Sequence, residues 1–108
     1  MWYILDKRNR PVPVEMLEGA LWLEQNRERR ILHQTHIGKV FISTVFLSLD
    51  HAYPPFDKKP LLYETMIFKL SADDEYQWRY TTRWQARRGH WKAVCFVLYR
   101  LFLRWIRV

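Results

Sequence analysis

Five polar side chains of this 108-residue chain could take part in chemistry together. Asp50 and His51 follow a strongly apolar run, where a strand is expected to open into a loop, and such strand ends often carry functional sites. Glu64 lies inside another apolar run, where a carboxylate needs a partner. Tyr80 and His90 come near Glu64 if the last strand pairs beside it. An acid, a base and neighbouring hydrogen-bonding groups could transfer a proton or hold a metal ion.

Three interpretations of this cluster stay open: a structural network of buried hydrogen bonds, which we favour, a binding pocket, or a catalytic site. Its spacing matches no metal-ligand signature. His33 and His36 stand three residues apart, so they would point to opposite faces of a strand. There is no glycine-rich phosphate loop and no nucleophile elbow. The sequence therefore predicts no cofactor and no metal.

The charge of the chain is divided unevenly. Residues 1–75 hold 10 Lys or Arg and 11 Asp or Glu, a net charge of −1, whereas residues 76–108 hold 8 Lys or Arg and no acid, a net charge of +8. This asymmetry favours an anionic partner, which could be nucleic acid, an acidic protein surface or anionic lipid. The plainer interpretation is a solvated, solubilising face.

A final helix is expected over about residues 83–107, capped by Thr81 or Thr82. At 100° per residue, one broad face should pack on the sheet with Trp91, Val94, Leu98, Leu101, Phe102 and Trp105. The opposite arc carries Phe96, Tyr99 and Leu103 among the basic residues Arg88, Lys92, Arg100, Arg104 and Arg107. Two apolar arcs exceed what one small sheet can cover. We therefore expect contact with a target protein or a homodimer through this helix, with nucleic acid as the alternative and a membrane surface less favoured.

The remaining segments predict an α+β fold. Strands are expected at residues 2–5, 30–36, 40–49, 61–69 and 76–81, and a helix at about 14–25, with loops at 50–60 and 71–75. The order is strand, helix, four strands, helix. Consecutive strands joined by short turns favour an antiparallel sheet of about four to five strands, with the helices packed on one face. The length predicts a single domain over residues 1–108.

Composition narrows the class of protein further. An aromatic content of 17% excludes a disordered chain and leads us to expect some aromatic side chains at an interface. Cys95 is the only cysteine, so no intramolecular disulfide can form, and its apolar neighbours predict a buried, inert thiol. The start of the chain lacks the pattern of a signal peptide, and no apolar run is long enough to span a bilayer. A cytoplasmic location is expected.

Several segments together resemble a family of small uncharacterised bacteriophage and prophage proteins, whose pattern is close to STVFLGLDH, then LFETMVF, then Y-S/T-T and G-H. The segments that carry the resemblance are Trp2 to Asp6 with Pro11 to Pro13, Ile42 to His51 (ISTVFLSLDH), Leu61 to Phe68 (LLYETMIF), Tyr80 to Thr82, and Gly89 with His90. The resemblance extends to about Lys92. This chain departs from the pattern in the loop 52–59, which lacks the usual glycines, and in its last helix, which is more basic and longer.

The resemblance implies a phage origin but brings no established activity. Small phage proteins without catalytic motifs often act by binding a host component. We therefore expect a non-enzymatic binding protein in the cytoplasm of the bacterial host, with a host protein or protein complex as partner. Inhibition of a host defence system, as by an anti-CRISPR protein, is one form of this activity. The alternatives are a nucleic-acid-binding accessory protein that uses the Arg-rich last helix, and a small hydrolase built on Asp50, His51, Glu64 and His90.

Overall fold

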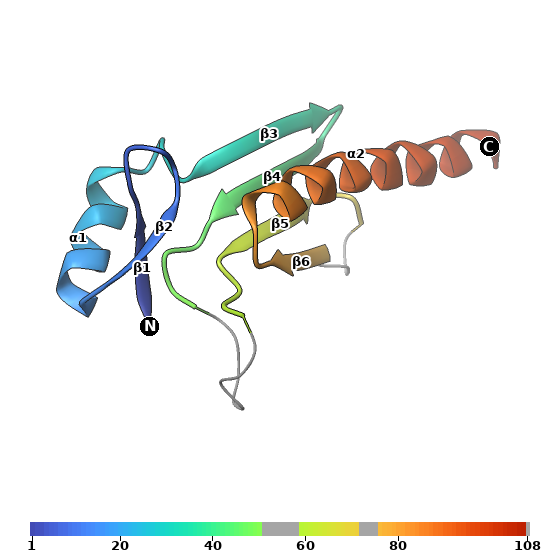
Figure 1. Ribbon diagram of the computed structural model, residues 1–108. Helices are drawn as coiled ribbons and strands as arrows, with labels where there is room; N and C mark the ends of the chain where they lie inside the picture. Colours follow the sequence, from blue (N-terminus) through green and yellow to red (C-terminus); the bar gives the residue numbers. More distant parts are fainter. Residues whose placement is uncertain (51–58, 72–75, 108) are drawn as a thin grey trace.

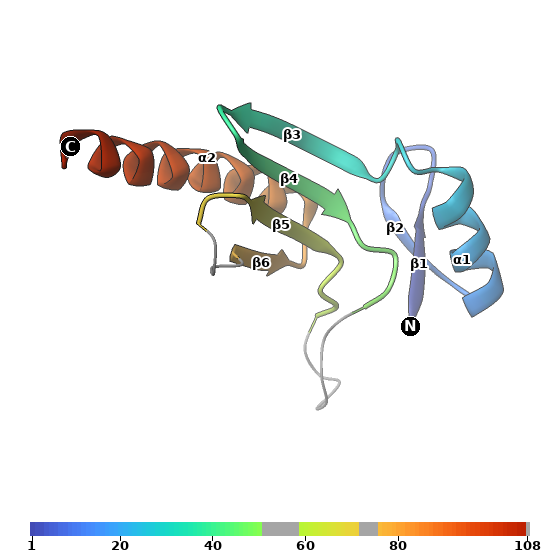
Figure 2. The same cartoon turned by 180° about the vertical axis from the view of Figure 1, so that it is seen from behind.

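The strongest β-prone segments of the sequence form a four-stranded antiparallel sheet (Figures 1 and 2). The computed structural model describes residues 1–50, 59–71 and 76–107. The strands are β3 (Ile31–Ile37), β4 (Val40–Phe46), β5 (Tyr63–Phe68) and β6 (Tyr76–Tyr80). Their spatial order, β3-β4-β5-β6, follows their order in the chain.

Alternation along β4 explains how this sheet acquires one buried face. Val40, Ile42, Thr44 and Phe46 are buried, and the residues between them are half-buried. Successive side chains of a strand point to opposite faces, so one face belongs to the core and the other is more open. Gly38 closes the β3–β4 hairpin with a φ of +59°, a conformation that glycine adopts without steric cost.

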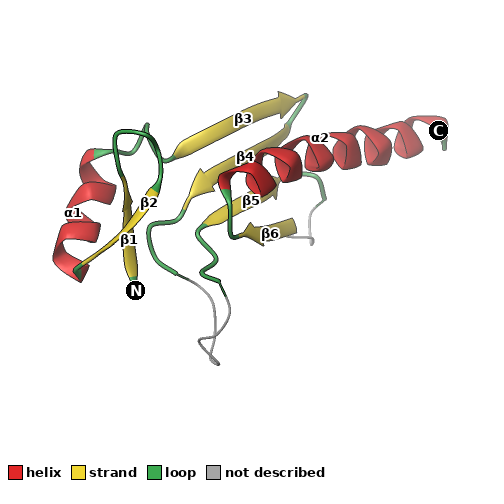
Figure 3. Ribbon diagram, in the orientation of Figure 1, coloured by secondary structure: helices red, strands yellow, loops and turns green. Residues whose placement is uncertain are grey.

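The long helix α2 (Arg83–Ile106) covers the buried face of the sheet (Figure 3). Thr82 begins it with a capping box, in which the Thr82 hydroxyl accepts from the Gln85 amide and the Gln85 side chain accepts from the Thr82 amide. Its last turns extend past the ends of the strands (Figure 1). Neither this helix nor the other one described combines the length and apolar character needed to cross a membrane.

A hairpin and a short helix form a second unit at one end of the molecule. Strands β1 (Trp2–Leu5) and β2 (Pro11–Val14) pair with each other, and helix α1 (Met16–Gln25) packs on β1. Gly19 allows close contact, because a Cβ there would lie 2.8 Å from two carbon atoms of Trp2. A hydrogen bond from the Tyr3 amide to the Ser48 carbonyl joins this unit to the end of β4.

The apolar core consists of two clusters. One lies between the middle of the sheet and α2, and contains Val40, Ile42, Ile67, Leu70, Ala93 and Val97. The other connects the sheet with the hairpin unit, and contains Leu5, Phe46, Leu62, Tyr63 and Ala86. Trp22 of α1 reaches this second cluster, with its ring edge-on to Phe46 at a centroid distance of 5.7 Å.

The α+β class and the antiparallel sheet are confirmed, but two details differ from expectation. Residues 11–14, where no strand was expected and where the first helix was expected to begin at about residue 14, form β2. Two prolines are tolerated there because β2 is a hairpin edge that pairs only with β1 among the described residues. The two helices were also expected on one face of a single sheet. Instead α1 packs on β1, and α2 covers the four-stranded sheet.

Candidate functional site

A chain of buried hydrogen bonds crosses the sheet beneath α2. His90 Nε2 lies 2.8 Å from Thr35 Oγ1 of β3, and His90 Nδ1 lies 2.8 Å from Thr44 Oγ1 of β4. Thr44 Oγ1 lies 2.6 Å from Thr65 Oγ1 of β5. The Tyr80 hydroxyl of β6 is hydrogen-bonded to Thr65. One side chain from each of the four strands therefore joins the network around His90.

Burial makes His90 a neutral member of this network. Desolvation, followed by the nearby His33, lowers the pKa of His90 to about 4. The centroids of the His33 and His90 rings are 5.3 Å apart. The side chain is fully buried and both ring nitrogens have hydrogen-bond partners. This arrangement supports the structural interpretation that we favoured, because it offers no ring nitrogen to a substrate.

Gly89 is required by the same arrangement. A Cβ at this position would lie 2.0 Å from the Tyr80 hydroxyl oxygen and 2.2 Å from the ring carbon that carries it. The Tyr80 ring therefore packs directly on the helix backbone. Burial raises the pKa of Tyr80, and its hydrogen bond with Thr65 opposes that shift.

Glu64 lies on the other face of the sheet. It is only 7% exposed. Arg79 Nε donates to Glu64 Oε2 at 3.0 Å, and Gln77 donates to the same oxygen. The prediction that Glu64 is buried and paired is confirmed, with Arg79 as its partner. However, Glu64 adjoins Thr65 in β5, so it points away from the network of His90 and Tyr80. The expected cluster of Glu64, Tyr80 and His90 does not form.

Asp50 has a local role at the start of the segment between β4 and β5. Its Oδ1 accepts a hydrogen bond from the Leu61 amide at 2.9 Å, and its own amide donates to the Met1 carbonyl at 3.0 Å. His51 lies outside the described residues. Among those that are described, no three His, Cys, Asp or Glu side chains are grouped so that they could hold a metal ion.

The predicted packing face of α2 is only partly right, because Val94 and Leu101 pack against the core but the four bulkiest positions do not. Trp91 is 54% exposed and Trp105 is 74% exposed, and Leu98 and Phe102 also face solvent. The residues of α2 that are buried are instead Ala86, Gly89, His90, Ala93 and Val97. Small side chains let the helix approach the sheet closely, whereas the bulky apolar ones were mistaken for core. Cys95, expected to be buried, is exposed on the outer side as well.

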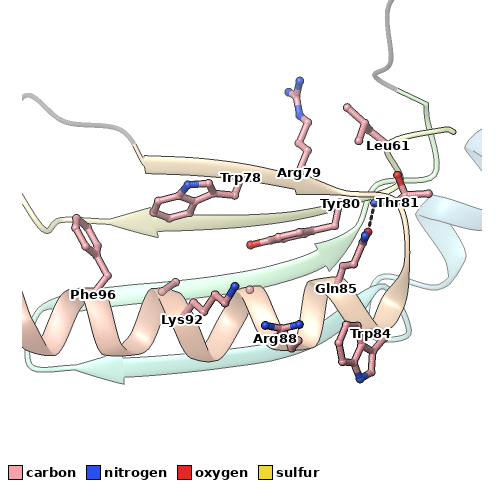
Figure 4. Close-up of a pocket in the computed structure, with 12 residues that line it drawn as sticks. Leu61, Trp78, Arg79, Tyr80, Thr81, Trp84, Gln85, Arg88, Lys92 and Phe96 are labelled. Carbon is pink, nitrogen blue, oxygen red and sulfur yellow. Dashed lines mark hydrogen bonds between the residues drawn. The ribbon is translucent and has the colours of Figure 1, made fainter. Parts of the chain in front are cut away.

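The predicted basic arc divides into two groups. Arg100 donates to the Tyr76 hydroxyl at 3.1 Å, and Arg104 donates to the Leu70 carbonyl. These two arginines therefore attach α2 to the sheet. Arg88 and Lys92 project on another side of the helix and line a groove (Figure 4).

This groove, called here the β6–α2 groove, has a volume of about 630 Å³. Figure 4 shows Trp78 and Tyr80 on the helix side of β6, with Arg79 pointing the other way. The Trp78 ring meets Phe96 of α2 edge-on at 6.1 Å. The lining residues that the structure describes are Leu61, Trp78, Arg79, Tyr80, Thr81, Trp84, Gln85, Arg88, Gly89, Lys92, Ala93 and Phe96.

The groove is both aromatic and cationic. Its described lining includes Arg79, Arg88 and Lys92 but no Asp or Glu. The Arg88 guanidinium lies 4.8 Å from the centroid of the Trp84 ring, which holds the cation at the rim. Arg79 is neutralised in part by Glu64, so Arg88 and Lys92 supply most of the positive potential. Such a site attracts anionic groups attached to apolar ones.

Sequence reasoning found Arg88, Lys92 and Tyr80 but did not single out Trp78 and Trp84. The strand expected at residues 76–81 is confirmed as β6, in which Tyr76 and Tyr80 are half-buried. Because β6 is the last strand of the sheet, Trp78 lies at the margin of the core and stays 40% exposed. An aromatic residue in a predicted edge strand was the signal available for this site.

Comparison of the chain with protein-family models, with curated proteins and with solved structures gives no match.

Proposed function

We propose that this chain is a non-enzymatic binding protein that holds an acidic, extended segment of a partner protein in the β6–α2 groove. The observation that carries the proposal is the lining of the groove, which combines aromatic walls with the cations of Arg88 and Lys92 and includes no acid among its described residues. Aromatic and arginine side chains are the residue types enriched where proteins bind proteins.

The position of β6 favours an extended partner. Within the described part of the chain β6 pairs only with β5, so its other edge can accept hydrogen bonds from an added strand. Such a strand would run along the groove beside α2. Alternate side chains could then meet the rings of Trp78 and Trp84, while carboxylates meet Arg88 and Lys92.

The resemblance to bacteriophage proteins directs the proposal toward a bacterial partner. We take that partner to be a host protein or protein complex in the cytoplasm. Binding of the partner's acidic segment in the groove would prevent that segment from making its normal contacts. Through this mode of binding the protein would inhibit a host defence system, such as a CRISPR complex.

Selection from a random peptide display library tests the proposal without knowledge of the partner. Peptides of about 12 residues are long enough to follow the strand and the groove. We expect wild-type protein to select sequences that alternate Asp or Glu with apolar residues, and the Arg88→Gln/Lys92→Gln variant to lose them. Enrichment of neutral or basic peptides, or no enrichment at all, would overturn the proposal.

Nucleic acid is the second candidate, favoured by a specific observation. Helix α2 contains no acid. Four of its basic residues are exposed, namely Arg87, Arg88, Lys92 and Arg104, and so is Arg107, which directly follows the helix. Anisotropy of a labelled oligothymidylate separates the two candidates. Binding through phosphates should weaken with a log–log salt slope of about −0.7 per contacted phosphate. Tight, salt-sensitive binding of this kind, with no acidic peptide selected, would favour the second candidate.

A further inference from the structure

The outer side of α2 carries a regular apolar seam that stays largely exposed, and only its Trp91 ring lies near a described ring of the sheet, that of His33 in β3. Trp84, Trp91, Leu98 and Trp105 recur every seven residues, and Cys95 and Phe102 fall between them. All six are exposed. A repeat of seven with intervening positions is the spacing of a helix that packs along another helix. Leu98, Phe102, Trp105 and Ile106 lie in its C-terminal part, near the end that projects past the strands (Figure 1).

Charge opposes the pairing of two α2 helices with each other. Residues 76–108 contain eight basic residues and no acid. Two copies of α2 packed along their seams would bring like charges together, as Arg87 and Arg88 are exposed on either side of the apolar residues. Like charges placed opposite each other destabilise a contact. An acidic helix therefore fits this seam better than a second α2 does.

Helix α1 of the same chain has the required character. Met16, Leu17 and Leu21 are exposed, with Leu17 at 70%. Glu18 and Glu24 are exposed on the same short helix. Residues 11–26 contain three glutamates and no Lys or Arg. Ten residues make α1 about 15 Å long, and the stretch from Leu98 to Ile106 is about 13 Å long at the same rise per residue.

We infer that α1 of one copy docks on the C-terminal half of α2 in a second copy. Leu17 and Leu21 would cover Phe102 and Trp105, and the glutamates would lie in the positive potential of residues 76–108, which contain no acid. The two surfaces lie toward opposite ends of one molecule (Figures 1 and 2), so a single copy cannot join them. Two copies placed antiparallel can make the contact twice, as a closed dimer. The contact uses no residue that lines the β6–α2 groove.

Sedimentation velocity tests this contact at protein concentrations up to the order of 100 µM. We expect wild-type protein to associate and Leu17→Ser/Leu21→Ser to weaken association at least about tenfold, because the apolar area is lost. Ile31→Thr is the matched control, since Ile31 is exposed on β3 outside both helices, and it should associate like wild type. A wild-type protein that stays monomeric would overturn the inference.

Mixing distinguishes α1–α2 docking from pairing of α2 with itself. Phe102→Ser/Trp105→Ser should also fail to associate alone, yet its equimolar mixture with Leu17→Ser/Leu21→Ser should form a dimer. One intact α1 and one intact α2 then remain in each mixed pair. If the α1 variant associates as well as wild type, α2 pairs with itself and the inference is wrong. Circular dichroism of each variant shows whether it has kept its fold.

The charges are tested separately. Glu18→Gln/Glu24→Gln raises the net charge by two, as Gln34→Lys/His36→Lys does on the exposed outer side of β3. Only the first pair should weaken association. Equal weakening by both pairs would show that general repulsion, and not α1, controls the contact, and would also overturn the inference.

Discussion

The side of α2 that packs on the sheet and the side that faces solvent consist of different types of residue. The inner side uses Ala86, Gly89, Ala93 and Val97, which are small, together with His90, whose polar atoms are all hydrogen-bonded. The outer side displays tryptophans, other large apolar residues and exposed cations. Because the helix lies close to the sheet, its inner side has room mainly for small side chains. The large exposed apolar residues on the outer side are the ones that the proposed contact with a second copy would cover.

The inner side also contains buried polar side chains whose hydrogen bonds are satisfied. Three threonines from three strands surround His90, and each hydroxyl finds a partner. Buried networks of this kind stabilise only when every group is satisfied, and they fix how neighbouring elements align. Changes on the inner side should therefore reduce stability, and changes on the outer side should reduce binding. The following predictions test that division.

The largest effect is expected at Gly89. Gly89→Ala would place a methyl group within the Tyr80 ring, and the overpacking should lower the free energy of unfolding by about 3 kcal/mol or more. Urea denaturation measures this change. Tyr80→Leu in the same background should recover part of the loss, because it removes the ring atoms in conflict. A Gly89→Ala protein as stable as wild type would contradict the packing described.

Acid should weaken the inner side through His90. The pKa of this histidine falls from 6.5 to about 4 on folding, so the unfolded chain binds more protons between these values. Stability should therefore be complete above pH 6.5 and fall by about 3 kcal/mol as the pH drops to 4. His33, whose pKa burial also lowers, adds to the same trend. His90→Gln should be less stable at pH 7 and should show a shallower decline with acid, measured by urea denaturation across this range.

A smaller effect is expected on the open face of the sheet. Arg79→Gln removes the ion-pair partner of Glu64, leaving its carboxylate with the hydrogen bond from Gln77 and the nearby charge of Arg30. Because the Arg79 side chain is 34% exposed, we expect a loss of only about 1–2 kcal/mol, short of that for a fully buried pair. Glu64→Gln/Arg79→Gln should be more stable than Arg79→Gln alone. A double-mutant cycle that gives no coupling between the two residues would rule out this pairing.

The smallest effect on stability is expected on the outer side. Arg88→Gln/Lys92→Gln should change the free energy of unfolding by less than about 0.5 kcal/mol, because both residues lie on the surface. Arg100→Gln/Arg104→Gln removes the same charge but also two hydrogen bonds to the sheet, so it should lose about 1–2 kcal/mol. Thermal unfolding of the two variants side by side distinguishes them.

Much of the fold was predictable because the relevant signals are local. The β-branched and aromatic run at 40–46 gives a strand, and Thr82 followed by Gln85 gives a helix start. The strand at 11–14 was missed because two prolines usually end a strand, and only the pairing with β1 makes them acceptable. The residue pattern within 11–14 gives no information on its pairing with β1.

The site was harder to predict because it depends on which side of each element faces which neighbour. Glu64 and Thr65 are adjacent in sequence but lie on opposite faces of the sheet, so a cluster of Glu64 with His90 was never available. The apolar stripe of α2 was assigned to the core by hydrophobicity alone. The size of Trp91 and Trp105, compared with Ala86 and Ala93, was the better guide, since the tight contact at Gly89 leaves little room there.

The central claim is that anionic segments bind in the β6–α2 groove, and one matched comparison tests it most directly. The affinity of a selected acidic peptide is measured by isothermal titration for Arg88→Gln/Lys92→Gln and for Arg100→Gln/Arg104→Gln, which carry the same net charge. We predict that the first variant loses at least about tenfold in affinity, as expected when two charge-assisted contacts are removed, while the second binds like wild type. Equal weakening in both variants would contradict the claim, because it would mean that the peptide responds to the overall charge of α2 and not to the groove.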